Sequence, residues 1–292
     1  MIIARSAGRL GNQLFVIAAL RKLSSSAKSL ILVGFEDLAE NFPDLVSKSR
    51  HIPLPRKYWA RWNHLESILR VLGALRVISV ITSQTEGHRL LRRWGLLPFA
   101  LFQGGWCQDE RLIESTLRHA LFVDIDISAV RAEIASALSL PTTKDHPVFF
   151  VHIRRGDYLT WPTLEHPAAL PESWYHDAVS EVQQSHPNAH FLVVSDDPEY
   201  AQDFATQLDS AIAVTADPRQ TLAYMSVCSG GILSASSFSW WGAWLASQDS
   251  PGPFIAPLHW ITWGEGRWDD SHSLDKSSFV TWMPVSDPSA ET

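Results

Sequence analysis

Short apolar segments alternate with longer segments of helical periodicity, and this alternation constrains the fold more than any other feature. In the second half, Val148–Ile153 is an apolar segment and Glu172–Ser185 follows it with helical spacing. His190–Ser195 and Pro198–Gln207 repeat the same pair. Strands that alternate with helices of this length are typical of βαβ units, which build parallel sheets. The sequence therefore predicts an α/β fold.

The alternation occurs in two series along the chain. Ile2–Arg5 and Asn12–Leu23 begin the first series, and Pro141–Pro147, with prolines around polar residues, is typical of a linker. A chain of 292 residues is long enough for two domains of ordinary size. We therefore predict two Rossmann-like domains, residues 1–145 and 146–292, with parallel sheets that face each other across a cleft.

Composition and charge exclude several classes of protein. No window approaches the ~20 uncharged apolar residues that a membrane-spanning helix requires, and the first residues lack the features of a secretory signal. Cys107 and Cys228 are too few for a disulfide framework or a cysteine-based zinc site, and we expect each to be buried and reduced. The net charge of −7 argues against general nucleic-acid binding.

Two adjacent arginines, Arg154 and Arg155, follow the apolar segment Val148–Ile153 in a half of the chain that is otherwise acidic. Residues 147–292 contain five Lys/Arg and 18 Asp/Glu, whereas residues 1–146 contain 19 and 13. Arginine binds phosphate bidentately, and open α/β sheets bind ligands at the carboxyl ends of their strands. A second interpretation stays open, in which one arginine pairs with Asp157 and the other is solvated, since adjacent strand side chains point to opposite faces.

The segment Gly8-Arg-Leu-Gly-Asn-Gln13 follows the first predicted strand and opens the first predicted helix. Glycines there allow close approach to the backbone, and free amides at a helix start attract anions. The segment matches neither the Gly-x-Gly-x-x-Gly pattern nor the phosphate loop, so nucleotide binding by those schemes is disfavoured. Taken alone, the segment is better explained as an ordinary strand-to-helix turn.

Polar side chains follow two further strands of the second half. Asp197 precedes Pro198 and has the chemistry of a helix N-cap, which leaves Asp196 as the candidate ligand for a ribose hydroxyl or a purine edge. Ser236 and Ser237 stand where a small-residue turn enters a helix, a geometry that suits a phosphate. Simple serine capping is the alternative for this turn.

Neither a metal site nor a serine-hydrolase site is indicated. The twelve histidines are scattered without the spacing of a ligand cluster, and no Gly-x-Ser-x-Gly elbow is present. We therefore expect no metal.

Taken together, these motifs resemble the bacterial α-1,2-fucosyltransferases of glycosyltransferase family 11. The matching segments occur in the order of the family and span most of the chain: residues 8–15, 102–106, 152–158, 195–197, 222–228 and 236–245. Three departures stand out. Tyr200 replaces a more usual tryptophan, Ala235 replaces a usual asparagine, and residues 41–100 match little. The resemblance gives residues 41–100 a part in choosing the acceptor.

The resemblance implies a two-domain GT-B architecture, with residues 1–145 on the acceptor side and residues 146–292 binding GDP-fucose. It also implies inversion at the sugar carbon and neither a metal nor another cofactor. The expected reaction is transfer of fucose to the 2-hydroxyl of a galactose residue in an oligosaccharide. Two alternatives stay open, a protein O-fucosyltransferase and a sugar-nucleotide or glycan-binding protein without turnover. We expect a cytoplasmic protein, with peripheral association at the inner face of a bacterial membrane left open.

The same resemblance assigns the site. Arg154 would contact the pyrophosphate, and Arg9 and Asn12 would face the donor sugar, so that these three residues are the expected catalytic set. The residues expected to bind GDP-fucose are His152 near the nucleoside, Arg154, Asp196 at guanosine, Ser236 and Ser237 at the β-phosphate, Phe238 and Gly11. A general base is not identifiable. Asp109 and Glu110 are candidates and are equally explained as acids of a first helical turn.

Overall fold

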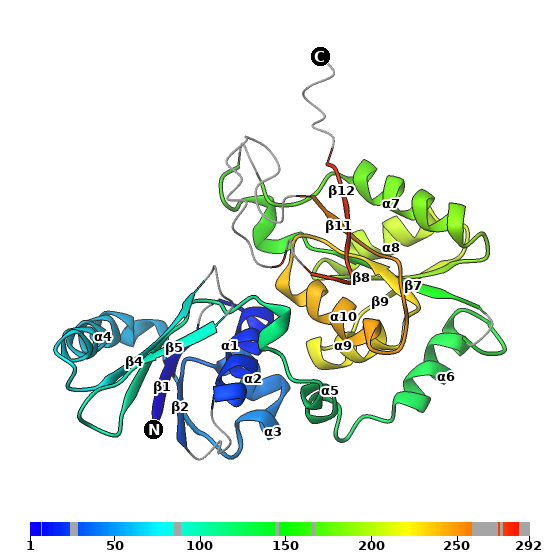
Figure 1. Cartoon of the computed structure of the whole chain (residues 1–292). Coiled ribbons are helices and arrows are strands. Elements are labelled where there is room, and N and C mark those ends of the chain that lie inside the picture. The colour runs from blue at the N-terminus through cyan, green and yellow to red at the C-terminus, as the bar shows by residue number, and fades with distance from the viewer. Residues whose placement is uncertain are drawn as a thin grey trace. The chain divides into compact units, whose positions relative to one another are not determined.

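The computed structural model describes residues 1–6, 8–23, 29–84, 89–143, 146–164, 167–258, 274 and 277–285. The chain divides into two compact units, Met1–Val123 (unit 1) and Asp124–Thr292 (unit 2). Within the described residues each unit contains one six-stranded sheet (Figure 1). Both sheets are mostly parallel and have helices between their strands, so the predicted α/β fold is confirmed.

The division between the units falls well before the expected boundary at residues 145 and 146. Helix α6 (Ile127–Ala137) accounts for the difference, because it bonds to helix α9 (Pro218–Ser226) and to the residue after it. The Tyr224 hydroxyl donates to Glu133 at 2.6 Å, and Arg131 donates to the carbonyl oxygen of Val227 at 3.3 Å. These contacts make α6 part of unit 2.

The sheet of unit 1 has one antiparallel member. Its strand order is β3 (Arg50–Ile52), β2 (Leu30–Val33), β1 (Ile2–Arg5), β6 (Ala100–Gln103), β4 (Ser79–Gln84), β5 (Arg89–Arg93). All neighbours pair in parallel except β4 and β5. The predicted parallel sheet is therefore confirmed except for this antiparallel pair at its edge. Gln84 and Arg89 are too close in sequence for the crossover that a parallel pair requires.

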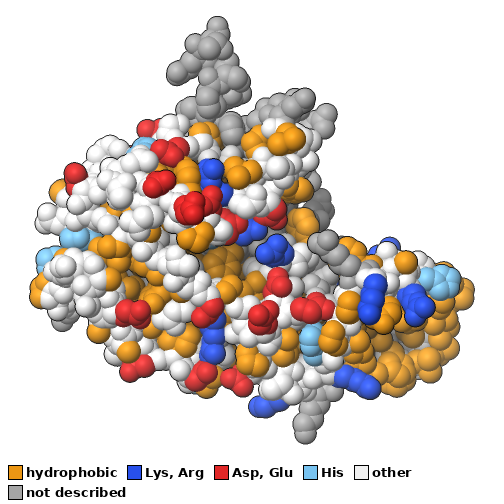
Figure 2. Space-filling view, turned by 180° about the vertical axis from the view of Figure 1, so that it is seen from behind, with side chains coloured by type: hydrophobic (Ala, Val, Ile, Leu, Met, Phe, Trp, Pro, Cys, Tyr) orange, Lys and Arg blue, Asp and Glu red, His pale blue; other side chains and the backbone are white. Residues whose placement is uncertain are grey.

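The helices of unit 1 differ in how deeply they are buried. They are α1 (Leu10–Leu23), α2 (Glu36–Asn41), α3 (Pro43–Val46), α4 (Trp59–Ala74) and α5 (Thr116–Leu121), with short 3₁₀ turns at η2 (Arg56–Tyr58) and η3 (Glu110–Leu112). Helix α1 buries an unbroken run from Gln13 to Leu20. In contrast, α4 buries only Gly73 among its residues, all of which are described. Figure 2 shows hydrophobic side chains gathered over the part of unit 1 that contains α4.

The sheet of unit 2 is parallel throughout its described strands. Its order is β12 (Thr281–Met283), β11 (Phe254–Pro257), β10 (Gly230–Ile232), β7 (Val148–Ile153), β8 (His190–Ser195), β9 (Ala211–Val214). The bounds of β7 and β8 are those predicted, whereas β11 and β12 were not predicted. Because β7 lies between β10 and β8, the carboxyl ends of these three strands meet at one edge.

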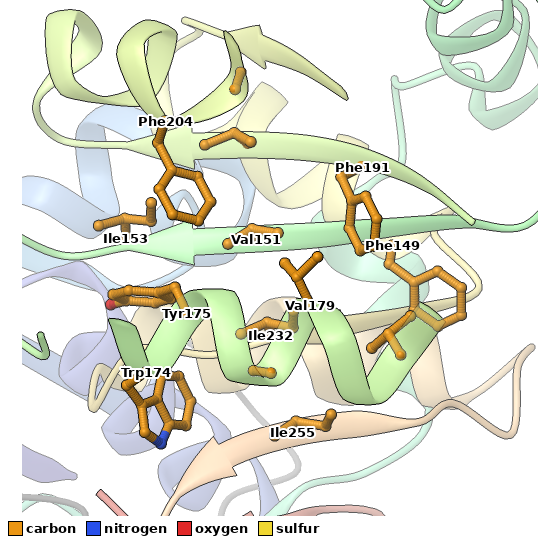
Figure 3. Close-up of a cluster of buried hydrophobic side chains, with 14 of the residues drawn as sticks. Phe149, Val151, Ile153, Trp174, Tyr175, Val179, Phe191, Phe204, Ile232 and Ile255 are labelled. Atoms are coloured by element: carbon orange, nitrogen blue, oxygen red, sulfur yellow. The ribbon is translucent and has the colours of Figure 1, made fainter. Parts of the chain in front are cut away.

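Alternate residues of β7 decide which way the functional side chains point. Phe149, Val151 and Ile153 pack into a buried cluster with α7 (Glu172–Ser185) and α8 (Pro198–Thr206), as Figure 3 shows. Each large apolar side chain buried in this way contributes about 1.5–3 kcal/mol. Because side chains alternate along a strand, His152 and the residue two positions later must point to the opposite face.

Helix α10 (Ser237–Ser247) covers that opposite face. Trp240, Trp241 and Trp244 are all buried, so this helix is anchored by its aromatic side chains. Gly242 lets it approach α9 closely, since a Cβ at that position would lie 2.7 Å from the Met225 sulfur. The packing fixes the amino terminus of α10 next to the carboxyl end of β7.

Candidate functional site in unit 2

His152, near the end of β7, is held as a neutral side chain between β10 and α10. Its Nδ1 atom lies 2.7 Å from the Ser234 hydroxyl oxygen, and its ring lies 5.6 Å from the ring of Phe238. Burial, reinforced by the positive charge of Arg154, lowers the pKa of His152 to about 3. The imidazole is therefore uncharged near neutral pH and can make hydrogen bonds without repelling Arg154.

Arg154 points to the same side as His152 and is held by two carboxylates. Its guanidinium lies 2.5 Å from the nearer oxygen of Asp157 and 3.0 Å from Asp196 Oδ2. The ring of Tyr158 lies beneath it, 5.4 Å from the guanidinium carbon. The Tyr158 hydroxyl in turn donates to the carbonyl oxygen of Ala235 at 2.9 Å. The guanidinium is thus fixed in place next to the turn that enters α10.

Arg155 points away from Arg154 and packs against α8. Its Nε donates to Asp197 at 3.2 Å, and its guanidinium carbon lies 3.8 Å from the centre of the Tyr200 ring. The second interpretation that the sequence left open had one arginine paired with Asp157 and the other solvated; Arg155 is instead bonded to Asp197. Asp157 pairs with Arg154, because the 3₁₀ turn η4 (Gly156–Leu159) brings residue i+3 to its side.

Asp196 ties the ends of β7 and β8 together. Its Oδ1 accepts the backbone N–H of Arg155 at 2.8 Å, while its Oδ2 pairs with Arg154. Gly156 makes room for it, since a Cβ there would lie 2.4 Å from Asp196 Oδ2. Asp196 therefore positions Arg154 in this structure, and its contact with guanosine stays a prediction. The predicted N-cap at Asp197 is confirmed, because its carboxylate accepts the N–H of Tyr200 at 3.2 Å.

The two serines at the start of α10 have different surroundings. Ser236 is the N-cap, and its hydroxyl oxygen accepts the N–H of Phe238 at 3.3 Å, so the capping interpretation is confirmed for this residue. Ser237 is the first helical residue and is partly exposed. Ser239 donates to the carbonyl oxygen of Ser234 at 2.9 Å and closes the turn. The contact of Ser236 and Ser237 with a phosphate stays a prediction.

The contacts just described bring the predicted residues of unit 2 to one edge of its sheet. His152 reaches Phe238, Arg154 reaches Asp196, and Tyr158 connects the arginine turn to the serine turn through Ala235. A fixed guanidinium, a neutral imidazole and the amino terminus of a helix form a surface suited to an oxyanion attached to an aromatic base.

Residues predicted as sugar-side contacts lie at the start of α1 in unit 1. Asn12 accepts a hydrogen bond from Gln108 Nε2 at 2.8 Å, whereas Arg9 is exposed and lies 3.7 Å from a carboxylate oxygen of Asp37. Gly8 has a φ of +76°, and a Cβ there would lie 2.5 Å from the Asn12 side chain. Gly11 is buried in the first turn of α1.

The two candidate bases lie at η3. The carboxylate of Asp109 accepts the backbone N–H of Arg111 at 2.9 Å and its Nε at 3.0 Å, so Asp109 is the N-cap of η3 and not an acid of its first turn. Glu110 is the first residue of the turn that Asp109 caps. A role for either carboxylate as a base stays a prediction.

Three residues that support the candidate site residues were not singled out from the sequence. Tyr158 and Ser234 support Arg154 and His152, and Gln108 orients Asn12. Tyr158 and Gln108 stand within or next to segments that the sequence had marked. Their partners could not be foreseen, because each lies far away in the sequence.

The described residues contain neither a metal-binding cluster nor a helix that could span a membrane. No group of three or more His, Cys, Asp or Glu side chains in the described ranges is arranged to hold a metal ion. Among the helices that the structure describes, none has the length and apolar character needed to cross a membrane.

Comparison with known proteins decides the family. The model of Glycosyl transferase family 11 matches residues 102–260, more than half of the chain. The chain belongs to this family. As a family member it is a glycosyltransferase, and the resemblance seen in its sequence motifs is confirmed.

Two curated relatives from Escherichia coli match over most of their length. The family 11 chain is 26% identical over 276 residues to an α-1,2-colitosyltransferase, with 89% of this chain and 92% of the relative covered. It is also 26% identical over 284 residues to the O-antigen biosynthesis glycosyltransferase WbnK, with 87% and 93% covered.

A solved structure supports the fold of the family 11 chain. The glycosyl transferase family 9 protein from Veillonella parvula matches with a TM-score of 0.50 and 12% identity, covering 98% of this chain and 87% of that chain. At this identity the likeness concerns the fold alone. It agrees with the two mostly parallel sheets seen here and with the predicted GT-B-like fold class.

The burial of His152 predicts how stability depends on pH. Its native pKa of about 3 lies below the ordinary value of 6.5, so below that value the unfolded chain binds a proton that the native state excludes. The stability contributed by neutral His152 is therefore present above about pH 6.5 and is lost as the pH falls towards 3. Between about pH 7 and about pH 5 the loss should be about 2 kcal/mol.

Urea unfolding of the wild type and His152→Gln at these two pH values measures this effect. The free-energy difference between the two proteins should shift in favour of the variant at the lower pH. His119→Gln, at an exposed position of α5, serves as the matched control and should leave the pH dependence unchanged. Equal pH dependence for wild type and His152→Gln would contradict the assignment.

Proposed function

We propose that this glycosyltransferase transfers fucose from GDP-fucose to the 2-hydroxyl of a galactose residue in an oligosaccharide, with inversion at the sugar carbon. The observation that carries the proposal is the fixed position of Arg154 at the end of β7, next to the turn that enters α10. Guanidinium and helix amides together are suited to the diphosphate of a nucleotide sugar. The sequence motifs that resemble α-1,2-fucosyltransferases support the choice of sugar and linkage.

Colitose is a second candidate for the transferred sugar. One relative is named an α-1,2-colitosyltransferase and another an O-antigen biosynthesis glycosyltransferase. Both names fit transfer to a glycan, and the first name fits a 1,2 linkage. Discrimination between sugars that differ by one hydroxyl depends on polar groups in the donor pocket, so donor identity is the point that the assay must decide.

In the proposed reaction, the bond between the sugar carbon and the β-phosphate oxygen breaks and its electron pair remains on GDP. The acceptor hydroxyl oxygen forms the new bond from the opposite face of the sugar, and its proton passes to a base or to water. Negative charge therefore grows on the diphosphate in the transition state. A preorganised donor at such a position typically contributes about 3–4 kcal/mol, and we assign this role to Arg154.

The surroundings of Arg154 are compatible with a diphosphate ligand. The guanidinium has five N–H donors, and its two carboxylate partners engage only some of them. The Asp157 side chain is half exposed, so an incoming phosphate can displace it while Asp196 keeps the guanidinium in place. In the proposal His152 and Phe238 lie beside the nucleoside, and Ser236 and Ser237 lie against the β-phosphate.

Arg9 and Asn12 remain the proposed contacts of the donor sugar, and Gln108 is the group that orients Asn12.

The two alternative functions predict different acceptors and different turnover. A protein O-fucosyltransferase would use a folded protein as its acceptor, and a non-catalytic binding protein would bind GDP without turnover.

A donor and acceptor assay tests the proposed function. We expect GDP release from GDP-fucose in the presence of lactose or another β-galactoside, and NMR of the product should show an α-1,2 linkage. GDP-linked colitose is the matched donor, and preferential turnover of it would replace fucose with colitose. GDP binding without turnover on any glycan or protein acceptor would contradict the proposal.

Two conservative substitutions separate the roles of the adjacent arginines. Arg154→Lys should lower kcat by about 100- to 1000-fold with the thermal midpoint little changed, because lysine cannot reproduce a bidentate contact to the diphosphate. Arg155→Lys should mainly lower the thermal midpoint, since it loses the contacts with Asp197 and Tyr200. Measurement of kcat, GDP affinity and thermal midpoint distinguishes them. A fully active Arg154→Lys enzyme would overturn the assignment.

Transfer should continue in excess EDTA. The prediction follows from the assignment of charge stabilisation to Arg154 and to the amino terminus of α10, which together replace the function that a divalent ion has in other glycosyltransferases. Initial rates of GDP release with and without the chelator give the measurement. Loss of activity that Mg²⁺ or Mn²⁺ restores would contradict it.

A further inference from the structure

A hydrophobic and basic surface on unit 1 takes no part in the chemistry proposed above. It consists of α4, the residue that follows it and the segment 91–97, and we call it the α4 surface. Its most prominent exposed apolar side chains are Ile68, Val71, Leu75, Trp94, Leu96 and Leu97. Contiguous exposed apolar side chains on a soluble fold mark an interaction site.

Helix α4 differs from an ordinary surface helix because exposed apolar side chains lie on its outward side. Its inward side carries Glu66, which pairs with Arg5 at 3.1 Å and with Arg70 at 2.6 Å. Its outward side carries Ile68, Val71 and, just beyond the helix, Leu75, which share one face at the i, i+3, i+7 spacing. Val71 and Leu75 are 58% and 68% exposed. An apolar outward face indicates that a partner covers α4.

The segment after β5 extends this apolar face. Arg93 donates to the carbonyl oxygen of Gly73 at 2.7 Å, and the Leu96 N–H donates to the carbonyl oxygen of Arg76 at 3.0 Å. These bonds hold the segment against the carboxyl end of α4. Trp94 and Leu96, which are 68% and 89% exposed, therefore extend the same surface.

The α4 surface has an excess of positive charge. Residues 59–75 and 91–97 contain four arginines, Arg61, Arg70, Arg92 and Arg93, and one acid, Glu66, in a chain whose net charge is −7. Glu66 points inward and is already paired with arginine. The Arg92 guanidinium lies 3.9 Å from the centre of the Trp94 ring. Figure 2 shows Lys and Arg side chains next to the hydrophobic ones on this part of unit 1.

We propose that the α4 surface docks onto an anionic lipid bilayer. Leucine, isoleucine and valine side chains can enter the boundary between headgroups and acyl chains, and tryptophan favours the headgroup level. Arginine and lysine can keep their charges at lipid phosphates while their stems lie along the apolar groups. The combination of exposed apolar side chains with interspersed cations fits this occupant.

A second copy of the chain fits less well. A symmetric contact would place the α4 surface of one copy against the same surface of the other, and this would bring like charges together. Stable protein interfaces also have few charged residues at their centres. The excess of cations thus favours an anionic partner.

Vesicle flotation tests the proposal with the full chain. Binding to vesicles of phosphatidylcholine mixed with phosphatidylglycerol should exceed binding to phosphatidylcholine alone, and it should weaken as salt is raised. Val71→Ser with Leu75→Ser should lower the partition coefficient about tenfold or more. Arg61→Gln with Arg92→Gln should lower it about fivefold per arginine.

Leu164→Ser, at a 77% exposed position of unit 2, is the matched control and should bind like the wild type. Thermal midpoints of all variants verify that each protein is folded. Wild-type binding by the Val71/Leu75 variant, or equal loss in Leu164→Ser, would overturn the proposal. So would absence of vesicle binding together with a dimer that the Val71/Leu75 substitutions dissociate, because the surface would then join two copies.

Discussion

One carboxylate connects the parts on which the unit 2 site depends. Asp196 accepts the backbone N–H of Arg155 at 2.8 Å and pairs with the Arg154 guanidinium at 3.0 Å, so the ends of β7 and β8 and the direction of Arg154 are fixed by one group. This arrangement requires Gly156, because a Cβ would lie 2.4 Å from the carboxylate. A partly buried guanidinium is tolerated only when its charge is balanced and its donors are satisfied. The Asp196 contact balances the charge and engages one end of the guanidinium, and Asp157 engages another donor.

Because side chains alternate along β7, the two adjacent arginines at its end point to opposite faces of the sheet and have different partners. Arg155 follows the side of Phe149, Val151 and Ile153, and there it packs on Tyr200 and pairs with Asp197. Tyr200 offers an aromatic face, and its hydroxyl donates to Glu172 at 2.5 Å. Arg154 follows the other side with His152. Arg155 therefore stabilises the turn, while its neighbour Arg154 is the candidate for binding phosphate.

Much of unit 2 could be predicted from sequence, and the failures have physical causes. Val148–Ile153 and His190–Ser195 are mostly apolar runs with clear ends, because central parallel strands are buried on both faces. Strand β5 reads Arg-Leu-Leu-Arg-Arg and lies at a sheet edge, where burial imposes no pattern. The motifs marked Arg154 and Asp196, but their ion pair joins residues far apart in sequence and appears only once β7 and β8 are aligned. The division between the units falls before the expected boundary at residues 145 and 146 for a similar reason, since α6 is placed in unit 2 by its contacts with Tyr224 and Val227.

Arg154 in unit 2 and the cations around α4 in unit 1 have contrasting surroundings. In the acidic second half, Arg154 is held between Asp157 and Asp196, so that nonspecific attraction of polyanions is weak and a ligand must meet a specific geometry. In unit 1 the cations around α4 stand beside exposed apolar side chains, and only Glu66 among the described residues of that surface offers an opposing carboxylate. An anionic surface would attract the cations around α4 and repel the acidic half of the chain. Charge asymmetry would therefore direct the α4 surface toward the bilayer, and the proposed ligand of Arg154 would have to replace Asp157.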